Sequence, residues 1–299
     1  MSYHNPVLLF ESIDGLDIVP NGVYVDVTFG GGGHSREILK RLGEDGKLFA
    51  FDQDEDALKN SIDDNRFTLI HENFRFVKRF LRLYGVKKVD GILADLGVSS
   101  HQFDEASRGF STRFDADLDM RMFSGTKKTA EHIINKYSEE RLSDILFLYG
   151  DLRNSRALAK QIIESRNEHP IQTSFQLKEA LQRFLPKSKE HKILAQIFQA
   201  VRIEVNEELE ALKEFLMQTE ELLDVGGKLS VISYHSLEDR LVKRYVRSGL
   251  FEGDPEKDFY GNVTVPFKKG KLITPSVKEI KENNRARSAK LRIATRLDG

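Results

Sequence analysis

The chain has 299 residues, of which 39% are hydrophobic and 31% charged, so it can bury a sizeable core and is not compositionally disordered. It contains no cysteine, which excludes a disulfide framework, a thiolate zinc site and a cysteine nucleophile. No apolar run approaches the roughly 18 residues of a membrane helix, and the N-terminal segment has no basic leader. We therefore expect a cytoplasmic protein that does not engage a membrane.

The charge is unevenly distributed. The formal net charge of −1 argues against a uniformly basic nucleic-acid binder. However, the stretch from Lys268 to Arg296 holds ten Lys or Arg against two acids, and the run from Arg75 to Lys88 holds six and no acid. Each patch is either a phosphate-binding surface or an ordinary solvated face.

The first third of the chain alternates short apolar runs with amphipathic stretches. The patterns predict strands at 22–28, 47–52, 68–71 and 90–95, and helices at 34–43, about 54–61 and 74–84. Strands that alternate with helices in this way indicate an α/β fold with a parallel sheet covered by helices on both faces.

A different sequence pattern, typical of helices, follows between about 105 and 200. Ser138, Ser174 and Ser188 are candidate helix caps, and a further helix is expected at 154–168. The α/β pattern then resumes with a helix at 207–223 and strands at 228–233 and 288–295, while 253–270 is expected to be a loop or hairpin. We therefore predict a first part of the α/β domain at 1–104, an all-helical insertion that recognises substrate at 105–200, and a second part with a basic C-terminal segment at 201–299.

Three features are expected at the carboxyl ends of the strands, where open parallel sheets bind ligands. A glycine turn, Gly30 to Gly33, follows the first strand, and glycines let the backbone pass close to a ligand. Asp52 ends the second strand, where a carboxylate can accept hydrogen bonds from a ribose diol. Asp95 ends the fourth strand.

The turn discriminates between cofactor classes. A dinucleotide favours Gly-x-Gly-x-x-Gly, but here the third glycine would fall on Ser35 or Arg36, and no Lys-Ser/Thr follows as in a nucleoside-triphosphate loop. Asp26, just before the turn, would oppose a pyrophosphate and suit a cationic ligand. These features favour S-adenosylmethionine, which has a ribose and no pyrophosphate.

Eight motifs, in chain order, closely resemble those of the ribosomal RNA small subunit methyltransferase H family (the MraW family): Tyr3–Leu9, Asp26–Ser35, Asp95–Ser100, Arg108–Ser111, Leu118–Arg121, Phe198–Ile203, Ser233–Arg240 and Arg285–Ser288. The resemblance covers nearly the whole chain. Departures are His191-Lys192, where many members have His-Pro, and Asn283-Asn284, where Asn-Pro is more usual.

The resemblance implies a bacterial enzyme that methylates the exocyclic N4 of a cytidine in the decoding centre of 16S ribosomal RNA, within the small ribosomal subunit. It implies a Rossmann-like methyltransferase sheet interrupted by an all-helical domain, with S-adenosylmethionine as donor and no metal. The cofactor-binding positions carried over by motif are Gly32, Gly33, His34, Asp52, Phe74, Asp95 and Gln102.

The catalytic candidates are Asp95, Ser99 and Ser100, because their motif follows the fourth strand, where many amino-methyltransferases place the residues that contact the amine. Asp95 contacts the amine, the cofactor alone, or both. A cytidine must leave its stack to be reached, and aromatic side chains can receive it. Phe110 and Tyr234 are candidates for this contact, each with packing as the alternative role.

The remaining RNA-binding candidates are His235, which could accept a proton or be structural, and Arg285 and Arg287, which would contact phosphate or RNA shape. Three other functions stay open on residue types alone: a nicotinamide-dependent oxidoreductase, a methyltransferase of protein or DNA, and a catalytically weak RNA-binding ribosome assembly factor. The sequence leaves the oligomeric state open, a homodimer included.

Overall fold

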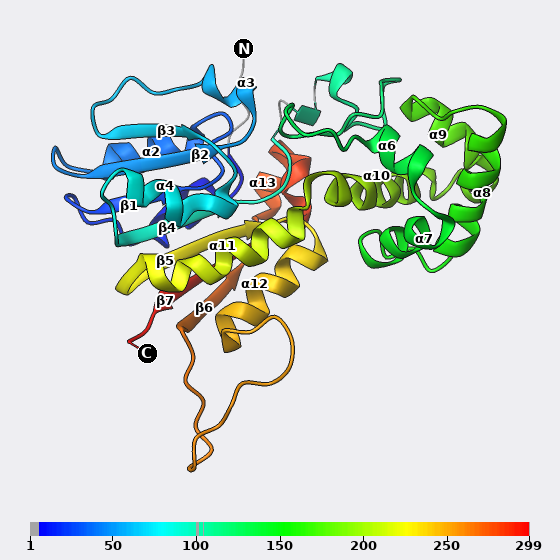
Figure 1. Cartoon of the computed structure of the whole chain (residues 1–299). Coiled ribbons are helices and arrows are strands. Elements are labelled where there is room, and N and C mark those ends of the chain that lie inside the picture. Colours follow the sequence, from blue (N-terminus) through cyan, green and yellow to red (C-terminus); the bar gives the residue numbers. More distant parts are fainter. Residues whose placement is uncertain (1–5, 100–101, 104, 299) are drawn as a thin grey trace. The chain divides into compact units, whose positions relative to one another are not determined.

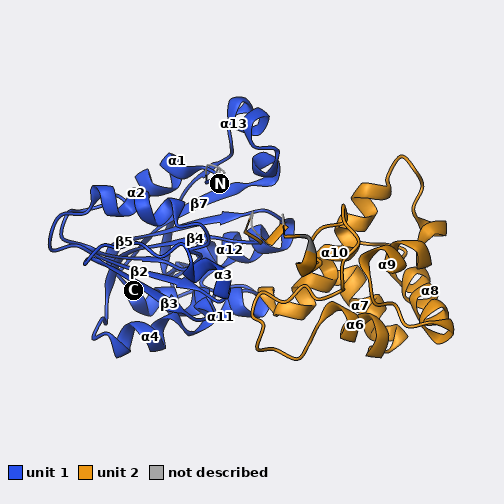
Figure 2. Ribbon diagram, turned by 90° about the horizontal axis from the view of Figure 1, so that it is seen from above, with its two compact units in different colours: residues 1–97, 209–299 blue, residues 98–208 orange. Residues whose placement is uncertain are grey.

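The computed structural model describes residues 6–99, 102–103 and 105–298. The chain forms two compact units: unit 1 comprises residues 1–97 and 209–299, and unit 2 comprises residues 98–208 (Figure 2). The second unit thus begins at 98 rather than 105 and ends at 208 rather than 200. It extends beyond 200 because a single helix, α10 (Glu190–Asn206), runs unbroken through that position.

Unit 1 is built on a seven-stranded sheet with the strand order β3-β2-β1-β4-β5-β7-β6 (Figure 1). The strands are β1 (Val23–Asp26), β2 (Lys47–Asp52), β3 (Phe67–His71), β4 (Val89–Asp95), β5 (Leu223–Ser233), β6 (Phe267–Ile273) and β7 (Lys290–Arg296). The first five are parallel, and β7 joins β5 and β6 in antiparallel register. The expected α/β fold with a Rossmann-like parallel sheet is confirmed.

Helices cover both faces of this sheet. They are α1 (Leu9–Asp14), α2 (Gly33–Arg41), α3 (Glu55–Leu58), α4 (Val77–Leu83), α11 (Glu208–Leu222), α12 (Ser236–Ser248) and α13 (Val277–Glu282). Residues of α1 and α2 share one hydrophobic cluster with the sheet, and residues of α4, α11 and α12 share another.

The two clusters follow from the period of two along each strand. In β1, Tyr24 packs with the α1–α2 side and Val25 with the α4–α11–α12 side. In β4, Leu93 faces the first side, whereas Ile92 and Ala94 face the second. These strands are apolar on both faces because both faces are buried.

β6 is a strand that the sequence pattern did not predict. Most of its residues between Phe267 and Ile273 are exposed, with Lys268, Lys269 and Lys271 among them. It pairs only with β7 and forms the edge of the sheet, where lysines discourage pairing with another chain. Such a strand has no alternation of apolar and polar residues, so periodicity could not identify it.

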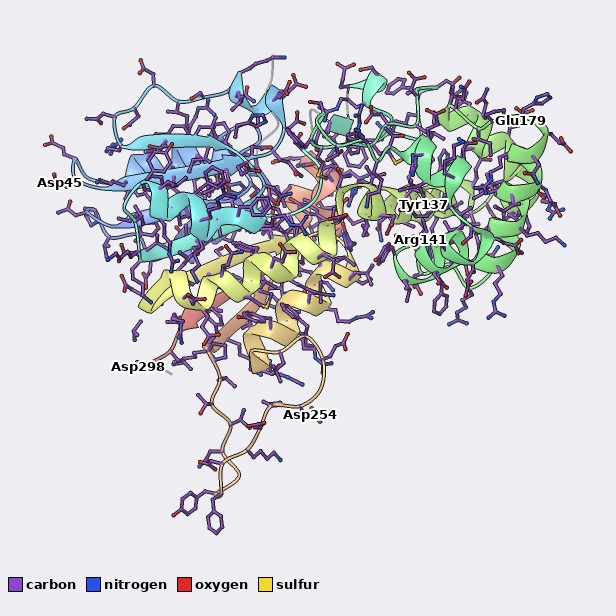
Figure 3. All side chains as sticks on the ribbon, viewed as in Figure 1. Asp45, Tyr137, Arg141, Glu179, Asp254 and Asp298 are labelled. Atoms are coloured by element: carbon purple, nitrogen blue, oxygen red, sulfur yellow. The ribbon has the colours of Figure 1, made fainter. Side chains whose placement is uncertain are left out.

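The long loop between α12 and β6 contains two exposed aromatic rings, Phe259 and Tyr260, which are 97% and 85% exposed. Their ring centroids are 5.5 Å apart in an edge arrangement. Exposed side chains line this loop on both sides of Asp254 (Figure 3).

Unit 2 is helical, as expected. Its helices are α6 (Ala130–Lys136), α7 (Glu139–Leu148), α8 (Ser155–Glu168), α9 (Ser174–Ala180) and α10 (Glu190–Asn206), packed around one apolar core. Tyr137 lies beside Arg141, with 4.5 Å between the ring centroid and the guanidinium carbon (Figure 3). Both side chains also bond Glu204 of α10.

Two of the predicted helix caps are wrong. Ser138 caps α7 as predicted, but Thr173 rather than Ser174 caps α9, and its hydroxyl accepts from the Gln176 N–H. The Ser174 hydroxyl instead donates to the Phe114 carbonyl. α10 starts after Lys189, with no side-chain cap, rather than after Ser188.

Within the described part of the chain, no helix is both long enough and apolar enough to cross a bilayer.

The capping box of α9 gives a testable stability effect. Thr173→Ala removes the acceptor of the Gln176 N–H, and we expect the free energy of unfolding of unit 2 to fall by about 1 kcal/mol, measured by urea denaturation of the full chain. Thr173→Ser keeps the hydroxyl and should retain most of the stability. An equal loss in both variants would mean that the threonine methyl, rather than the cap, matters.

Candidate functional site

Three carboxylates end three neighbouring strands. Asp26, Asp52 and Asp95 are the last residues of β1, β2 and β4, and β1 lies between the other two. The register pairs Asp26 with Ala50 of β2 and with Leu93 of β4. The structure therefore brings these side chains together along the edge of the sheet that is formed by the carboxyl ends of its parallel strands.

Asp26 differs from the other two because it is fully buried. Its Oδ2 accepts from the Ser35 hydroxyl at 2.7 Å, and its Oδ1 accepts from the Thr28 N–H at 3.1 Å. Burial raises the pKa of Asp26 to about 6, although the bonds from Ser35 and Thr28 oppose that shift. Asp26 thus ties the end of β1 to the turn and to the start of α2, and its effect on a ligand would be through charge rather than contact.

The glycine turn lies between these carboxylates. Gly30 donates its N–H to Oδ2 of Asp52 at 2.8 Å. Gly32 has a φ of +75°, in the left-handed region that favours glycine, and precedes the first turn of α2. A side chain at Gly33 would collide with the ring of Pro6, so packing by itself accounts for a glycine there.

The first turn of α2 points toward the same edge. Helix geometry leaves the first N–H groups of α2, including those of Gly33 and His34, without partners inside the helix, and the helix dipole makes this end positive. A ligand carboxylate fits such an end.

The His34 ring is buried between two partners. Its Nε2 lies 3.3 Å from the Val7 carbonyl, and its Nδ1 lies 3.8 Å from Oδ2 of Asp95. A carbonyl only accepts, so Nε2 carries the proton and Nδ1 presents a lone pair to Asp95. Burial lowers the pKa of His34 to about 4, so the ring is neutral at pH 7.

Asp52 keeps acceptor capacity after its protein contacts. Its Oδ1 accepts from the Asp54 N–H at 2.8 Å and its Oδ2 from Gly30, which uses two of about four acceptor positions. Burial raises the pKa of Asp52 to about 6. The carboxylate is only partly buried by area, so two hydroxyls of a ribose can reach it.

Phe74 begins η1 (Phe74–Phe76), three residues beyond the end of β3, which is the neighbour of β2. Its ring packs edge-on against Phe215 of α11 at 5.5 Å and is half-buried. The amide of Asn73 donates to Oε1 of Gln53 at 2.7 Å, which joins this segment to the residue after Asp52.

Asp95 is held by two further contacts. Its backbone N–H donates to the Thr28 hydroxyl at 2.6 Å, and its Oδ1 accepts from the Tyr234 hydroxyl at 2.8 Å. Burial raises the pKa of Asp95 to about 7, although the hydrogen bond from Tyr234 acts in the opposite direction. Its side chain is still 23% exposed, so a substrate can touch it, unlike Asp26.

Tyr234 and His235 have protein partners in the structure. Burial raises the pKa of Tyr234 well above its usual value, so its hydroxyl is a donor, and the ring packs against a cluster that includes Ile232 and Leu291. His235 caps α12: its Nδ1 accepts from the Glu238 N–H, and its Nε2 lies 3.0 Å from Oε1 of Glu238. These contacts place the Tyr234 hydroxyl on Asp95 and make His235 the N-cap of α12.

Of the predicted site residues that the structure describes, three belong to unit 2. Ser99 and Gln102 bond each other reciprocally, with the Ser99 N–H on Oε1 of Gln102 at 3.0 Å and the Gln102 N–H on the Ser99 hydroxyl at 3.2 Å. Phe110 is 4% exposed and lies in the core of that unit, so stacking on a base would require it to leave the core. Ser100, like Tyr3 to Asn5 of the first motif, lies outside the described residues.

Arg285 and Arg287 lie in η4 (Asn284–Ser288), between α13 and β7. Arg287 is exposed and Arg285 is half-buried, and the Asn283 side chain caps the segment by accepting from the Arg285 N–H. The substitution of Asn284 for the more usual proline is thus accommodated in a short helical turn.

Sequence reasoning missed the residues that join the site together. Tyr234 and Asp95 are 139 positions apart, so no local pattern could reveal their bond. The side-chain amide of Asn60 donates to the Gly30 carbonyl at 3.0 Å and so stabilises the turn, although the two residues are 30 positions apart in the sequence. Asn73 could have been recognised as a cap, since it precedes a helical segment.

Comparison with known proteins shows the family of the chain. The family description "MraW methylase family" matches residues 1–297. The chain is 68% identical to "Ribosomal RNA small subunit methyltransferase H" of Christiangramia forsetii and 64% identical to the protein of that name from Flavobacterium johnsoniae, in both cases over 99% of each chain. It is 55% identical to the protein of the same name from Bacteroides thetaiotaomicron, over 98% of this chain and 97% of the other.

The raised carboxylate pKa values predict how stability depends on pH. Between about pH 4 and pH 7 the folded chain holds protons at Asp26, Asp52 and Asp95 that the unfolded chain has released, so their contribution to stability falls as the pH rises through this window. Each pKa unit of difference corresponds to about 1.4 kcal/mol. Asp95→Asn should make the loss between pH 5 and pH 8 shallower, measured by urea denaturation without cofactor.

Asp45→Asn, at an exposed position, is the control and should follow the wild-type curve. A curve for Asp95→Asn as steep as the wild-type curve would refute the raised pKa of Asp95.

Proposed function

This chain belongs to the MraW methylase family, and on that premise we propose that it transfers a methyl group from S-adenosylmethionine to 16S ribosomal RNA of the small ribosomal subunit. The acceptor in this proposal is the exocyclic N4 of a decoding-centre cytidine, as the resemblance of the sequence motifs implies. The observation that carries the proposal is the glycine turn after β1, with Asp52 and a partly exposed Asp95 at the ends of the two strands that flank β1.

The residues at the strand edge fit the cofactor group by group. The free acceptor positions of Asp52 suit the two ribose hydroxyls, and the half-buried ring of Phe74 offers an apolar face for the adenine. The N-terminal end of α2 suits the carboxylate of the methionine part, and the buried charge of Asp26 suits its cationic groups.

Bound S-adenosylmethionine supplies a methyl group that is already electrophilic, because it is attached to a sulfonium. The protein has to hold the cytidine amine in line with it, and positioning of this kind can contribute about 7–11 kcal/mol. In this proposal Asp95 accepts a hydrogen bond from the amine, so that its nitrogen lone pair is turned toward the methyl.

Tyr234 positions this carboxylate. Its hydroxyl occupies Oδ1 of Asp95 at 2.8 Å, which leaves Oδ2 for the amine. The pKa of Asp95, raised to about 7, lies close to working pH, a value suited to a group that takes a proton from an amine as it becomes cationic. The neutral His34 beside Oδ2 adds no competing positive charge.

Gly32→Ala tests the turn against a matched control. Both Gly32 and Gly85 have φ of +75°, but an added Cβ at Gly32 would lie 2.6 Å from Nη1 of Arg36 and 2.9 Å from the Phe29 ring, whereas at Gly85 it would meet nothing within 4 Å. We expect both alanine variants to lose about 1–2 kcal/mol of stability, from the left-handed backbone. Only Gly32→Ala should also weaken S-adenosylmethionine binding, by about tenfold or more in calorimetric titration.

Equal weakening by Gly85→Ala would show that general destabilisation, not the turn, controls binding of the cofactor.

The central experiment follows labelled methyl from S-adenosylmethionine to small ribosomal subunits that lack the modification. The expected product is one N4-methylated cytidine, identified by digestion and mass spectrometry. Asp95→Asn should lower kcat by about a hundredfold or more while the Kd for the cofactor changes little, because the amide cannot accept the proton. Naked 16S RNA should be a poor substrate, since the decoding centre is shaped by its surroundings.

Tight cofactor binding without any transfer to subunits or RNA would instead favour a ribosome assembly factor on a methyltransferase fold. A large rise in the Kd for the cofactor with unchanged kcat in Asp95→Asn would limit Asp95 to cofactor contact.

A further inference from the structure

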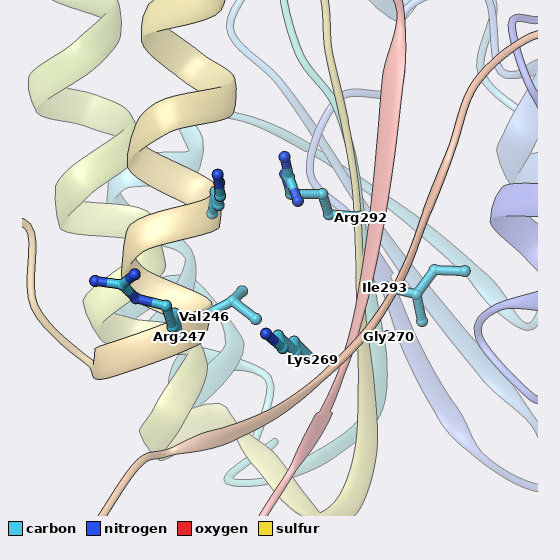
Figure 4. Close-up of a pocket in the computed structure, with 7 residues that line it drawn as sticks. Val246, Arg247, Lys269, Gly270, Arg292 and Ile293 are labelled. Atoms are coloured by element: carbon cyan, nitrogen blue, oxygen red, sulfur yellow. The ribbon is translucent and has the colours of Figure 1, made fainter. Parts of the chain in front are cut away.

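A cavity of about 220 Å³ lies in unit 1 between α12 and the strands β6 and β7 (Figure 4). It is lined by Lys243, Val246, Arg247, Lys269, Gly270, Arg292 and Ile293. The lining therefore contains four cations and no acid, and none of the carboxylates at the strand edge belongs to it.

The size of the cavity limits its ligand. Sites for drug-sized molecules and cofactors usually measure about 300–1,000 Å³, so this cavity is small for a whole nucleotide. A single phosphate group needs less room and carries the complementary charge. The lining thus favours a phosphate that belongs to a larger molecule whose other parts remain outside.

Three of the four cations have no acidic partner. Among the residues that the structure describes, no carboxylate lies within ion-pair distance of Lys243, Arg247 or Lys269, and all three are exposed. Like charges gathered in this way repel one another, and an anion between them would relieve the repulsion.

Asp239, which does not line the cavity, fixes the position of Arg292. Its Nε donates to Oδ1 of Asp239 at 2.7 Å, while Lys290 approaches Oδ2 of the same carboxylate at 3.2 Å. Burial would raise the pKa of Asp239, but the bonds from Arg292 and Lys290 outweigh burial and lower it, so this carboxylate stays ionised. The Nη groups of Arg292 are donors beyond the one that Asp239 uses.

The surroundings of the cavity favour a polyanion. Together α12, β6 and β7 contain ten Lys or Arg, and their two acids, Glu238 and Asp239, are both buried. The whole chain has a net charge of −1, so positive charge is concentrated on these three elements. A local field of this kind attracts a phosphate backbone more strongly than a single small anion.

The cavity is close to the candidate active site along the sheet. Arg292 pairs with Val231, two residues before the end of β5 at Ser233, and Tyr234 follows directly. The three residues from Val231 to Tyr234, at about 3.3 Å each, correspond to roughly 10 Å, about the rise of three phosphates along a helical strand.

We propose that this cavity holds a backbone phosphate of the substrate RNA, within a few nucleotides of the methylated base. The proposal rests on the proposed RNA methyltransferase function and adds a binding site to it. Contacts with phosphates set the register of a nucleic acid and do not read its sequence, so the cavity would position the target rather than select it.

The test replaces the three unpaired cations in the full-length protein, as Lys243→Gln, Arg247→Gln and Lys269→Gln together. A control variant carries Lys40→Gln, Lys47→Gln and Lys257→Gln, which are also exposed, lie outside both basic stretches and remove the same charge elsewhere on unit 1. For each protein, binding to small ribosomal subunits is measured at several salt concentrations, together with steady-state methyl transfer, cofactor Kd and Tm.

We expect the cavity variant to bind subunits at least tenfold more weakly at about 0.1 M salt, with a salt dependence shallower by about one in log–log slope. Its KM for subunits should rise more than its kcat falls, while its Tm and cofactor Kd stay at wild-type values. The control variant should stay within about twofold of wild type.

Wild-type affinity and salt slope in the cavity variant would overturn the proposal, and so would an equal loss in the control variant, which would indicate general attraction. Loss of binding to anionic phosphatidylglycerol vesicles with intact subunit binding would assign the cavity to a membrane surface and also overturn it. If the wild-type protein neither binds nor methylates subunits, the proposed function itself fails, and the inference fails with it.

Discussion

The buried carboxylate of Asp26 is the contact on which the candidate site depends. It joins the end of β1 to the Thr28 backbone and to the Ser35 hydroxyl in the first turn of α2. The Thr28 hydroxyl in turn accepts a hydrogen bond from the backbone N–H of Asp95 at the end of β4. A buried polar group is costly unless its hydrogen bonds are made, so these partners are fixed together. The glycine turn is therefore held at both ends, and Asp52 and Asp95 are presented on either side of it.

The same arrangement separates structural from accessible acids. Asp26, Asp52 and Asp95 occupy equivalent strand ends and all have raised pKa values, because burial disfavours their charged forms. However, both oxygens of Asp26 accept hydrogen bonds from the protein, and its side chain is fully buried. Asp52 and Asp95 are partly exposed and keep acceptor positions that a ligand can use. In the proposed function, these two accessible carboxylates are the ones that a methyl donor and an acceptor would contact.

The parts of the fold that follow local rules could be predicted from the sequence. The strands β1, β2 and β4 have apolar runs that end in an acid, and Ser138 stands where a cap is needed. The edge strand β6 could not be predicted, because its lysines face solvent and no periodicity marks it. Nor could the bond between Tyr234 and Asp95, which depends on how β5 lies beside β4. Phe110, as an aromatic residue in a loop motif expected near a strand end, suggested stacking, but it lies in the core of unit 2.

The insertion of unit 2 between β4 and β5 has a consequence for synthesis of the chain. Asp95 pairs with Ile232, so the ribosome has to add well over a hundred residues before the two central strands can meet. At about 5–20 residues per second this takes several seconds or more. Unit 2 is continuous in sequence and can fold during that interval. The side of β4 that will pair with β5 stays unpaired until β5 is made. The order of translation thus leaves the central sheet of unit 1 incomplete until β5 has been synthesised, whereas all of unit 2 is made before then.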